Sequence, residues 1–132
     1  MSTSVKHHEV VLHFVFTPKY RLPLLVGEVA RRCEQHFRQV CDELDIEIIA
    51  LAIMPDHVHL LIAESRTITR AYFVQRVKGR ASHHLRQEFP DLKKIKAFWG
   101  RDYFVRSVGG GRQAVRKYIE SQGITAPTHQ EN

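Results

Sequence analysis

The chain has 132 residues, of which 43% are hydrophobic and 26% charged, with a formal net charge of +6. This length predicts one domain, residues 1–132, whose core is large enough to fold without disulfides or a structural metal. A pI of about 9.6 favours a polyanionic partner, most commonly nucleic acid. The sequence shows neither a membrane-spanning apolar run nor a signal-peptide layout, which predicts a cytoplasmic protein with no membrane partner.

The first third of the chain predicts a strand and a helix. Residues 9–17 (EVVLHFVFT) are β-branched and aromatic, and a proline ends them, as is typical of a strand. A basic loop follows at 19–21. Apolar residues then recur every three to four positions over 27–44, which predicts an amphipathic helix. Cys33 and Cys41 lie eight positions apart in it, too far to pair, so we expect reduced thiols.

The middle of the chain predicts a strand pair and a second helix. Residues 46–54 and 57–63 are apolar, and the short Pro55-Asp56 link predicts an antiparallel turn between them. Thr69 is the expected cap of a helix that runs to about Phe89. The positions expected to face inward in this helix are Ala71, Tyr72, Val74, Val77, Ala81 and Leu85.

The last third predicts a strand and a final helix. A lysine-rich loop at 93–96 precedes a strand at 103–108, and the glycines of 109–111 suit a hinge. A helix is expected over 112–122, with a glycine at its end. The polar tail from 125 is expected to be disordered, which leaves an ordered core of about 9–123.

This order of elements predicts an α+β, ferredoxin-like fold of the split β-α-β type. Such a fold has a four-stranded antiparallel sheet with two helices on one face, here followed by an additional C-terminal helix. The strand at 57–63 lies in the middle of such a sheet, with one side on the helix-free face. Many activities share this plan, so the fold alone does not specify a function.

The most informative motif is Met54-Pro55-Asp56-His57-Val58-His59-Leu60-Leu61. Side chains alternate along a strand, so His57 and His59 share one face while Val58 and Leu60 turn toward the core. Two neighbouring imidazoles can bind a metal ion or a phosphate. A pair of surface histidines is an equally good interpretation of this motif when it is taken alone.

A second pair lies in the last helix, where Tyr118 and Gln122 are four residues apart on one helical face. A tyrosine phenol can attack phosphorus and form an ester that conserves the bond energy for strand rejoining. The glutamine amide oxygen can join two imidazoles around a divalent ion that polarises a phosphate. Taken alone, this pair more often belongs to an ordinary amphipathic helix surface.

Taken together, these features resemble the single-tyrosine HUH transposases of small insertion sequences, the TnpA type of the IS200-like family. The resemblance covers about residues 10–122. It rests on five ordered segments, which are 17–21 (TPKYR), 25–30 (LVGEVA), 54–61 (MPDHVHLL), 77–82 (VKGRAS) and 117–122 (KYIESQ).

The resemblance implies a catalytic site made of Tyr118 as nucleophile and of His57, His59 and Gln122 as ligands of Mg²⁺ or Mn²⁺. It implies an enzyme that recognises hairpins in single-stranded DNA and cleaves and rejoins strands through a 5′-phosphotyrosine. It also implies a homodimer in which the tyrosine helix completes the histidine site of the other subunit, in trans. The glycines of 109–111 suit a helix that pivots in this way.

Basic and aromatic side chains are candidates for DNA contacts. For each residue, a solvated helix face or a packed aromatic is an equally good interpretation, and Lys78 and Arg80 are favoured because they flank a glycine in a matching segment. The phosphate-binding candidates are Lys19, Arg21, Lys78, Arg80 and Arg86, and the base-stacking candidates are Trp99 and Tyr103.

Other functions explain the sequence less well. A histidine-triad hydrolase needs a third histidine where Leu61 stands, and an RNA-binding module of this fold shows aromatics on its central strands. Replication initiators and relaxases share the HUH chemistry but are usually larger. A non-mobile domesticated relative, or a ferredoxin-like nucleic-acid-binding module without cleavage activity, is the remaining alternative.

Overall fold

The computed structural model describes residues 10–109 and 111–124. Its four strands form one antiparallel sheet in the order β2-β3-β1-β4, which confirms the predicted α+β architecture. The elements in chain order are β1 (Val11–Phe16), η2 (Lys19–Arg21), α1 (Gly27–Glu43), β2 (Ile48–Met54), β3 (His57–Ala63), α2 (Arg70–Glu88), η3 (Pro90–Lys94), β4 (Phe104–Val108) and α3 (Gly111–Ser121).

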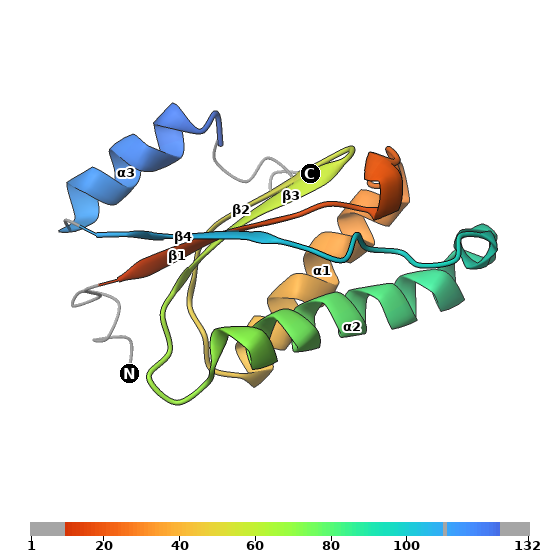
Figure 1. Ribbon diagram of the computed structural model, residues 1–132, viewed down its shortest axis with the longest axis horizontal. Coiled ribbons are helices and arrows are strands. Elements are labelled where there is room, and N and C mark those ends of the chain that lie inside the picture. Colours follow the sequence, from red (N-terminus) through yellow and green to blue (C-terminus); the bar gives the residue numbers. More distant parts are fainter. Residues whose placement is uncertain (1–9, 110, 125–132) are drawn as a thin grey trace.

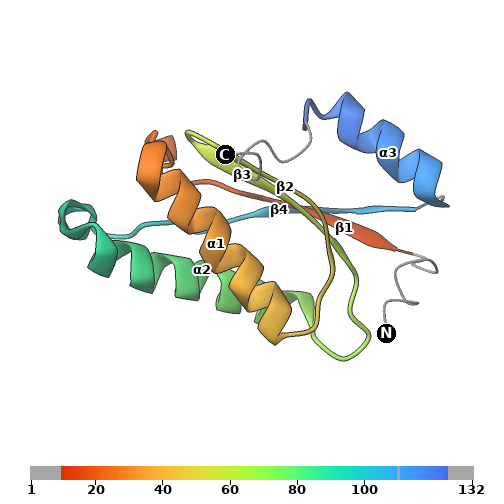
Figure 2. The ribbon, with the colours of Figure 1, turned by 180° about the vertical axis from the view of Figure 1, so that it is seen from behind.

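The sheet separates two helical layers. Helices α1 and α2 cover one face, and α3 lies over the opposite face (Figure 1, Figure 2). The main core lies between the sheet and the α1–α2 layer, where Phe14, Val58 and Leu60 are fully buried. Strand β3 pairs with β1 on one edge and with β2 on the other, so it is an interior strand of the sheet. One of its faces meets the α1–α2 layer, and the other lies on the side of α3.

A second, smaller apolar cluster holds α3 on the other face. Val115 of α3 is buried there with Val11, Leu61 and Val108 from three different strands. This contact places α3 above the outward-facing side chains of the central strands. The helix bearing Tyr118 is therefore docked on the sheet face that also carries the odd-numbered residues of β3.

Some local predictions were wrong. The two predicted basic loops contain short 3-10 helices at 19–21 and 90–94. Thr69 does cap α2 by accepting a hydrogen bond from the Tyr72 N–H at 3.1 Å, but Tyr72 and Ala71 are exposed rather than inward. Phe73 is buried instead, because the inward face of α2 follows positions 73, 74, 77, 81 and 85.

Several predicted features fall outside the described residues, namely the N-terminal start of the first strand, Gly110 within the predicted hinge, and the polar tail. Cys33 and Cys41 are both buried and unbonded, and burial raises the pKa of the Cys41 thiol to about 12. Among the described helices, none combines the length and apolar character that a membrane crossing requires.

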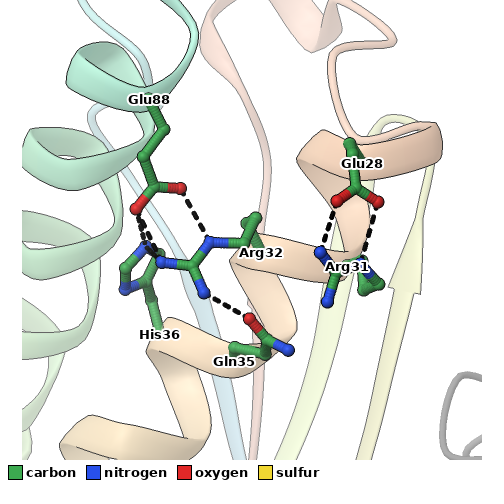
Figure 3. Close-up of polar contacts among 6 residues, drawn as sticks. All are labelled: Glu28, Arg31, Arg32, Gln35, His36 and Glu88. Atoms are coloured by element: carbon green, nitrogen blue, oxygen red, sulfur yellow. Dashed lines mark hydrogen bonds and ion pairs between the residues drawn. The ribbon is translucent and has the colours of Figure 1, made fainter.

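A polar cluster ties α1 to α2 (Figure 3). The Glu88 carboxylate of α2 accepts hydrogen bonds from Arg32 Nε at 2.9 Å and Nη2 at 2.7 Å, and it lies 3.0 Å from His36 Nε2. The Arg32 guanidinium, followed by His36, lowers the pKa of Glu88 from 4.5 to about 2. This bidentate contact supports the packing of the helical layer behind the sheet.

We expect Glu88→Gln to lower the free energy of unfolding at pH 7 by roughly 1–2 kcal/mol, since a charge-assisted contact is lost. The lowered pKa means that the carboxylate stabilises the fold above about pH 4.5 and loses this effect as the pH falls toward 2. Denaturant unfolding at several pH values measures the difference, which should shrink over that window. Glu28→Gln is the control, because Glu28 pairs with Arg31 of its own helix and, in the described part of the chain, forms no ion pair with α2 (Figure 3). A difference that is independent of pH would contradict the assignment.

Candidate active site

His57 and His59 lie on the face of β3 that points away from α1 and α2. Their ring centroids are 4.9 Å apart, while the intervening Val58 is fully buried in the main core. The alternation of side chains along an interior strand produces this arrangement. The histidine pair therefore sits on the sheet face that α3 covers.

His57 is oriented by the turn that precedes it. Its Nδ1 lies 2.7 Å from Asp56 Oδ1, and the other oxygen of Asp56 accepts a hydrogen bond from Arg21 Nε at 3.2 Å. His57 and then Arg21 lower the pKa of the Asp56 carboxyl. A carboxylate on one ring nitrogen is typical of histidines that bind metal through the other nitrogen. In the described part of the chain, His57 Nε2 makes no hydrogen bond, so it is available to a ligand.

His59 is oriented by a third histidine. Its Nδ1 lies 3.0 Å from Nε2 of His13, which is only 1% exposed in the middle of β1. Burial, followed by the neighbouring His57, lowers the pKa of His59. His59 Nε2 has no hydrogen-bond partner within residues 10–109 and 111–124. Each of the two imidazoles therefore has one ring nitrogen that could bind a metal ion, with ring centroids 4.9 Å apart.

Tyr118 joins this cluster from α3. Its hydroxyl oxygen lies 2.6 Å from His13 Nδ1, and its ring meets the His13 ring edge to face at 5.3 Å. The Arg106 guanidinium of β4 lies 5.6 Å from the centre of the Tyr118 ring. The structure thus connects the predicted nucleophile to the histidine pair through His13, within a single chain.

Gln122 follows the last residue of α3. Its N–H donates to the Tyr118 carbonyl at 3.1 Å, which keeps both residues on the same helical turn. The side chain is exposed and makes no hydrogen bond to the histidines in the described structure, and the described residues contain no group of three His, Cys, Asp or Glu able to hold a metal. The role of Gln122 as third ligand stays a prediction. Two imidazole nitrogens and an amide oxygen suit Mn²⁺ better than Mg²⁺, which prefers oxygen.

Sequence reasoning did not identify His13, Arg106 or the orienting role of Asp56. His13 interrupts an apolar strand at a position that alternation places on the sheet face opposite α1 and α2, and this was the available signal. Burial, and then the charges of His59 and Arg106, lower the pKa of His13 to about 4, so this imidazole is neutral at pH 7.

The predicted phosphate contacts differ in availability. Lys78 Nζ donates to the Gly100 carbonyl at 2.9 Å and Arg86 Nη2 donates to the Ile95 carbonyl at 2.9 Å, so both brace the segment before β4. Arg80 pairs with Glu43. Arg21, whose side chain is 63% exposed, is more accessible than these three residues. Lys19 is half-buried, and its Nζ lies 5.4 Å from the centre of the Tyr20 ring.

The structure argues against base stacking by Trp99. This ring is 8% exposed, packs on Phe16 and Phe37, and donates its Nε1–H to the Lys78 carbonyl at 3.0 Å. Apolar packing has therefore placed it in the core. Tyr103, the other predicted stacking residue, is 37% exposed, and Tyr20 is 79% exposed beside Lys19.

Comparisons with known proteins agree on one family. The family model of IS200-like transposases matches residues 6–122. The chain is 32% identical over 113 residues to the IS200 transposase of Salmonella typhimurium, covering 83% of this chain and 74% of that one. It is 32% identical over 119 residues to the ISDra2 transposase TnpA of Deinococcus radiodurans, covering 87% and 85%.

Solved structures show the same likeness. A crystal structure from Deinococcus radiodurans R1, assigned as a transposase, has a TM-score of 0.72 and 31% identity, and the match covers 86% of this chain and 91% of that one. A REP-associated tyrosine transposase bound to a REP hairpin has a TM-score of 0.63 at 14% identity, covering 86% and 63%. The second similarity concerns the fold alone.

Proposed function

This chain belongs to the IS200-like transposase family, and we propose that it cleaves and rejoins single-stranded DNA at insertion-sequence ends with Tyr118 as nucleophile. The observation that carries the proposal is the contact between the Tyr118 hydroxyl and His13, at 2.6 Å, beside the histidine pair. A tyrosine on a solvent-exposed helix surface would not contact a buried histidine in this way. The cluster instead combines a nucleophile with groups that bind phosphate or metal.

The proposed reaction is a substitution at phosphorus. The Tyr118 oxygen forms a bond to the scissile phosphorus, and the bond from phosphorus to the 3′-oxygen breaks. The phenolic proton passes to solvent, and the departing oxygen takes a proton from solvent to become a free 3′-hydroxyl. The 5′-phosphotyrosine conserves the bond energy, so attack by a 3′-hydroxyl reverses the step and joins strands.

His57 and His59 would hold Mg²⁺ or Mn²⁺ through their Nε2 atoms, with Gln122 as the third protein ligand. The bound ion supplies stabilisation of negative charge on the scissile phosphate. Asp56 and His13 contribute by holding the rings, since each contacts the Nδ1 atom of one histidine at 2.7 and 3.0 Å.

The proposed substrate is single-stranded DNA that carries hairpins. The net charge of +6 supports a nucleic-acid partner, and the exposed Arg21 is the most accessible of the candidates for phosphate contacts. A hairpin bound by a structural neighbour is consistent with this substrate class.

We also propose a homodimer. Strand β4 lies at the edge of the sheet, and Phe104 on it is 50% exposed. An exposed edge with an aromatic side chain favours pairing with a second copy. In the trans arrangement, Tyr118 of each subunit meets the histidines of the other.

The test is a denaturing gel that detects a covalent protein–DNA adduct. The substrate is a pool of single-stranded oligonucleotides with a hairpin and randomised flanks, with Mn²⁺ present. We expect an adduct that EDTA or His57→Ala removes, with a loss of at least about 100-fold. His84→Gln is the control, because His84 lies on α2 across the sheet and stacks on His36. Cleavage unchanged by EDTA contradicts the metal role, and hairpin binding without any adduct favours the non-cleaving alternative.

A further inference from the structure

We propose that His13 is a positioning residue that fixes His59 and the Tyr118 oxygen relative to each other. This inference rests on the proposed function, which assigns metal binding to His59 and nucleophilic attack to Tyr118. It adds a residue that lies outside the five sequence segments on which the resemblance rests. His13 touches neither DNA nor metal in this scheme and acts only through its two neighbours.

The His13 ring is confined on all sides. It is 1% exposed at the centre of β1, where it is paired in register with Leu61 of β3 and Arg106 of β4. Phe104 approaches its ring edge to face at 5.9 Å. Both of its ring nitrogens are used, Nε2 by His59 at 3.0 Å and Nδ1 by Tyr118 at 2.6 Å. The ring therefore cannot rotate without breaking both contacts.

The number of ring protons determines which atoms donate and which accept in the Tyr118–His13–His59 contacts. A neutral imidazole has one donor and one acceptor nitrogen, so His13 donates at one end and accepts at the other. If the Tyr118 hydroxyl donates to His13 Nδ1, then His13 Nε2 donates to His59 Nδ1. His59 must then carry its own proton on Nε2. In this arrangement the Nε2 lone pair that a metal needs is absent.

Metal binding selects the opposite direction. A metal on His59 Nε2 leaves the His59 proton on Nδ1, which donates to His13 Nε2. His13 then carries its proton on Nδ1 and donates it to the Tyr118 oxygen. The phenol accepts this hydrogen bond from the sheet side, so its own O–H turns to the open side. No proton is gained or lost, and only the tautomers of two rings change.

The consequence is a coupling between the metal and the nucleophile. When the ion is bound, the Tyr118 oxygen accepts a hydrogen bond from His13 Nδ1–H, and its own O–H points away from the sheet. Without the ion, either direction of donation satisfies both contacts of His13, so the hydroxyl is not fixed in one orientation. His13 thereby fixes the hydroxyl of the tyrosine in one orientation when the ion is bound, whether the tyrosine comes from the same chain or from a second subunit.

The direct test is a nitrogen NMR spectrum of the full chain with ¹⁵N-labelled histidine, recorded while Mg²⁺ is added. Ring nitrogen shifts report which nitrogen carries the proton. We expect His59 and His13 to carry it on Nδ1 at saturating Mg²⁺, with His84 unchanged. A His13 ring whose tautomer does not respond while His57 and His59 do respond overturns the inference. Absence of any histidine response to Mg²⁺, together with no Mn²⁺ binding in calorimetry, overturns the inference and the metal role in the proposed function.

Two variants separate the two contacts. In His13→Gln, the side-chain amide reaches the position of the former Nε2 atom and keeps the contact to His59. In His13→Asn, the shorter amide reaches the position of the former Nδ1 atom and keeps the contact to Tyr118. We expect His13→Asn to weaken Mn²⁺ binding, measured by calorimetry, by about 10- to 100-fold. We expect His13→Gln to bind Mn²⁺ within about threefold of wild type but to form the adduct about 10- to 100-fold more slowly at saturating Mn²⁺.

The outcomes distinguish this inference from the proposed function. If both variants match wild type in metal affinity and adduct rate while Tyr118→Phe forms no adduct, His13 has no positioning role and the proposed function stands. If Tyr118→Phe still forms the adduct, the proposed function fails first. Equal losses of metal affinity and rate in both variants indicate a merely structural role and also overturn the inference. The NMR experiment needs no variant, so it decides the question even if neither variant folds.

Discussion

Tyr118→Phe should abolish the covalent protein–DNA adduct, with a loss of at least about 1000-fold, while hairpin binding stays largely intact. The substitution removes one oxygen atom and keeps the ring that packs against His13 and beneath Arg106. Only the attacking atom is lost, so binding surfaces on the rest of the chain do not change. Denaturing gels measure the adduct, and a mobility shift in parallel samples measures binding.

The controls for this variant address position and folding. Tyr72→Phe removes a hydroxyl from an exposed tyrosine on α2, across the sheet from the histidines, and should form the adduct at the wild-type rate. Tyr118→Phe leaves His13 Nδ1 without its partner, so a stability loss of roughly 1–2 kcal/mol is expected in denaturant unfolding. An adduct that persists in Tyr118→Phe would place the nucleophile elsewhere, and peptide mapping of the adduct would identify it.

Much of the fold followed from local patterns in the sequence. The apolar runs, the Pro55-Asp56 link and the Thr69 cap are short-range signals, and each predicted the element that the structure contains. The errors arose where tertiary packing decides between equivalent choices. Tyr72 and Phe73 are adjacent aromatics near a helix start, and only the docking of α2 on the sheet shows which one is buried.

The site was predictable to a smaller extent. The shared face of His57 and His59 follows from strand alternation alone. His13 is 46 residues from His59 and 105 from Tyr118, and a single histidine in an apolar strand gives no indication of either contact. Trp99 was assigned to DNA from its residue type, whereas its burial depends on an aromatic cluster assembled from distant segments. Long-range assembly of this kind leaves no local pattern in the sequence.

The geometry of α3 bears on how two subunits share the site. In the chain described, Val115 and Tyr118 dock on the sheet of their own chain. A symmetric dimer presents an identical docking surface on each subunit, so the same helix can make the same contacts in exchange. The segment before α3 is short and rich in glycine, and β4 ends directly before it at the sheet edge. Pairing through β4 would bring both docking surfaces within reach of both helices.

Complementation between two inactive variants should reveal the trans arrangement. Tyr118→Phe and His57→Ala are co-expressed with different affinity tags, and heterodimers are purified through both tags. In the trans arrangement one of the two sites combines an intact histidine pair with an intact tyrosine, so the adduct should recover to about half of the wild-type level. The denaturing gel should show the DNA attached to the His57→Ala chain, since this chain carries the tyrosine.

In a cis arrangement each site of the heterodimer lacks either the tyrosine or a histidine, so no adduct forms and the trans proposal is wrong. Failure to recover any protein through both tags contradicts the dimer itself. Two separately purified variants mixed without subunit exchange provide the baseline, because neither homodimer has an intact site.

A second heterodimer checks the arrangement independently. One of its chains carries both Tyr118→Phe and His57→Ala, and the other chain is wild type. In the trans arrangement, one site of this heterodimer has the tyrosine but lacks His57, and the other has His57 but lacks the tyrosine, so no adduct should form. In the cis arrangement, the wild-type chain has a complete site and should give about half of the wild-type adduct.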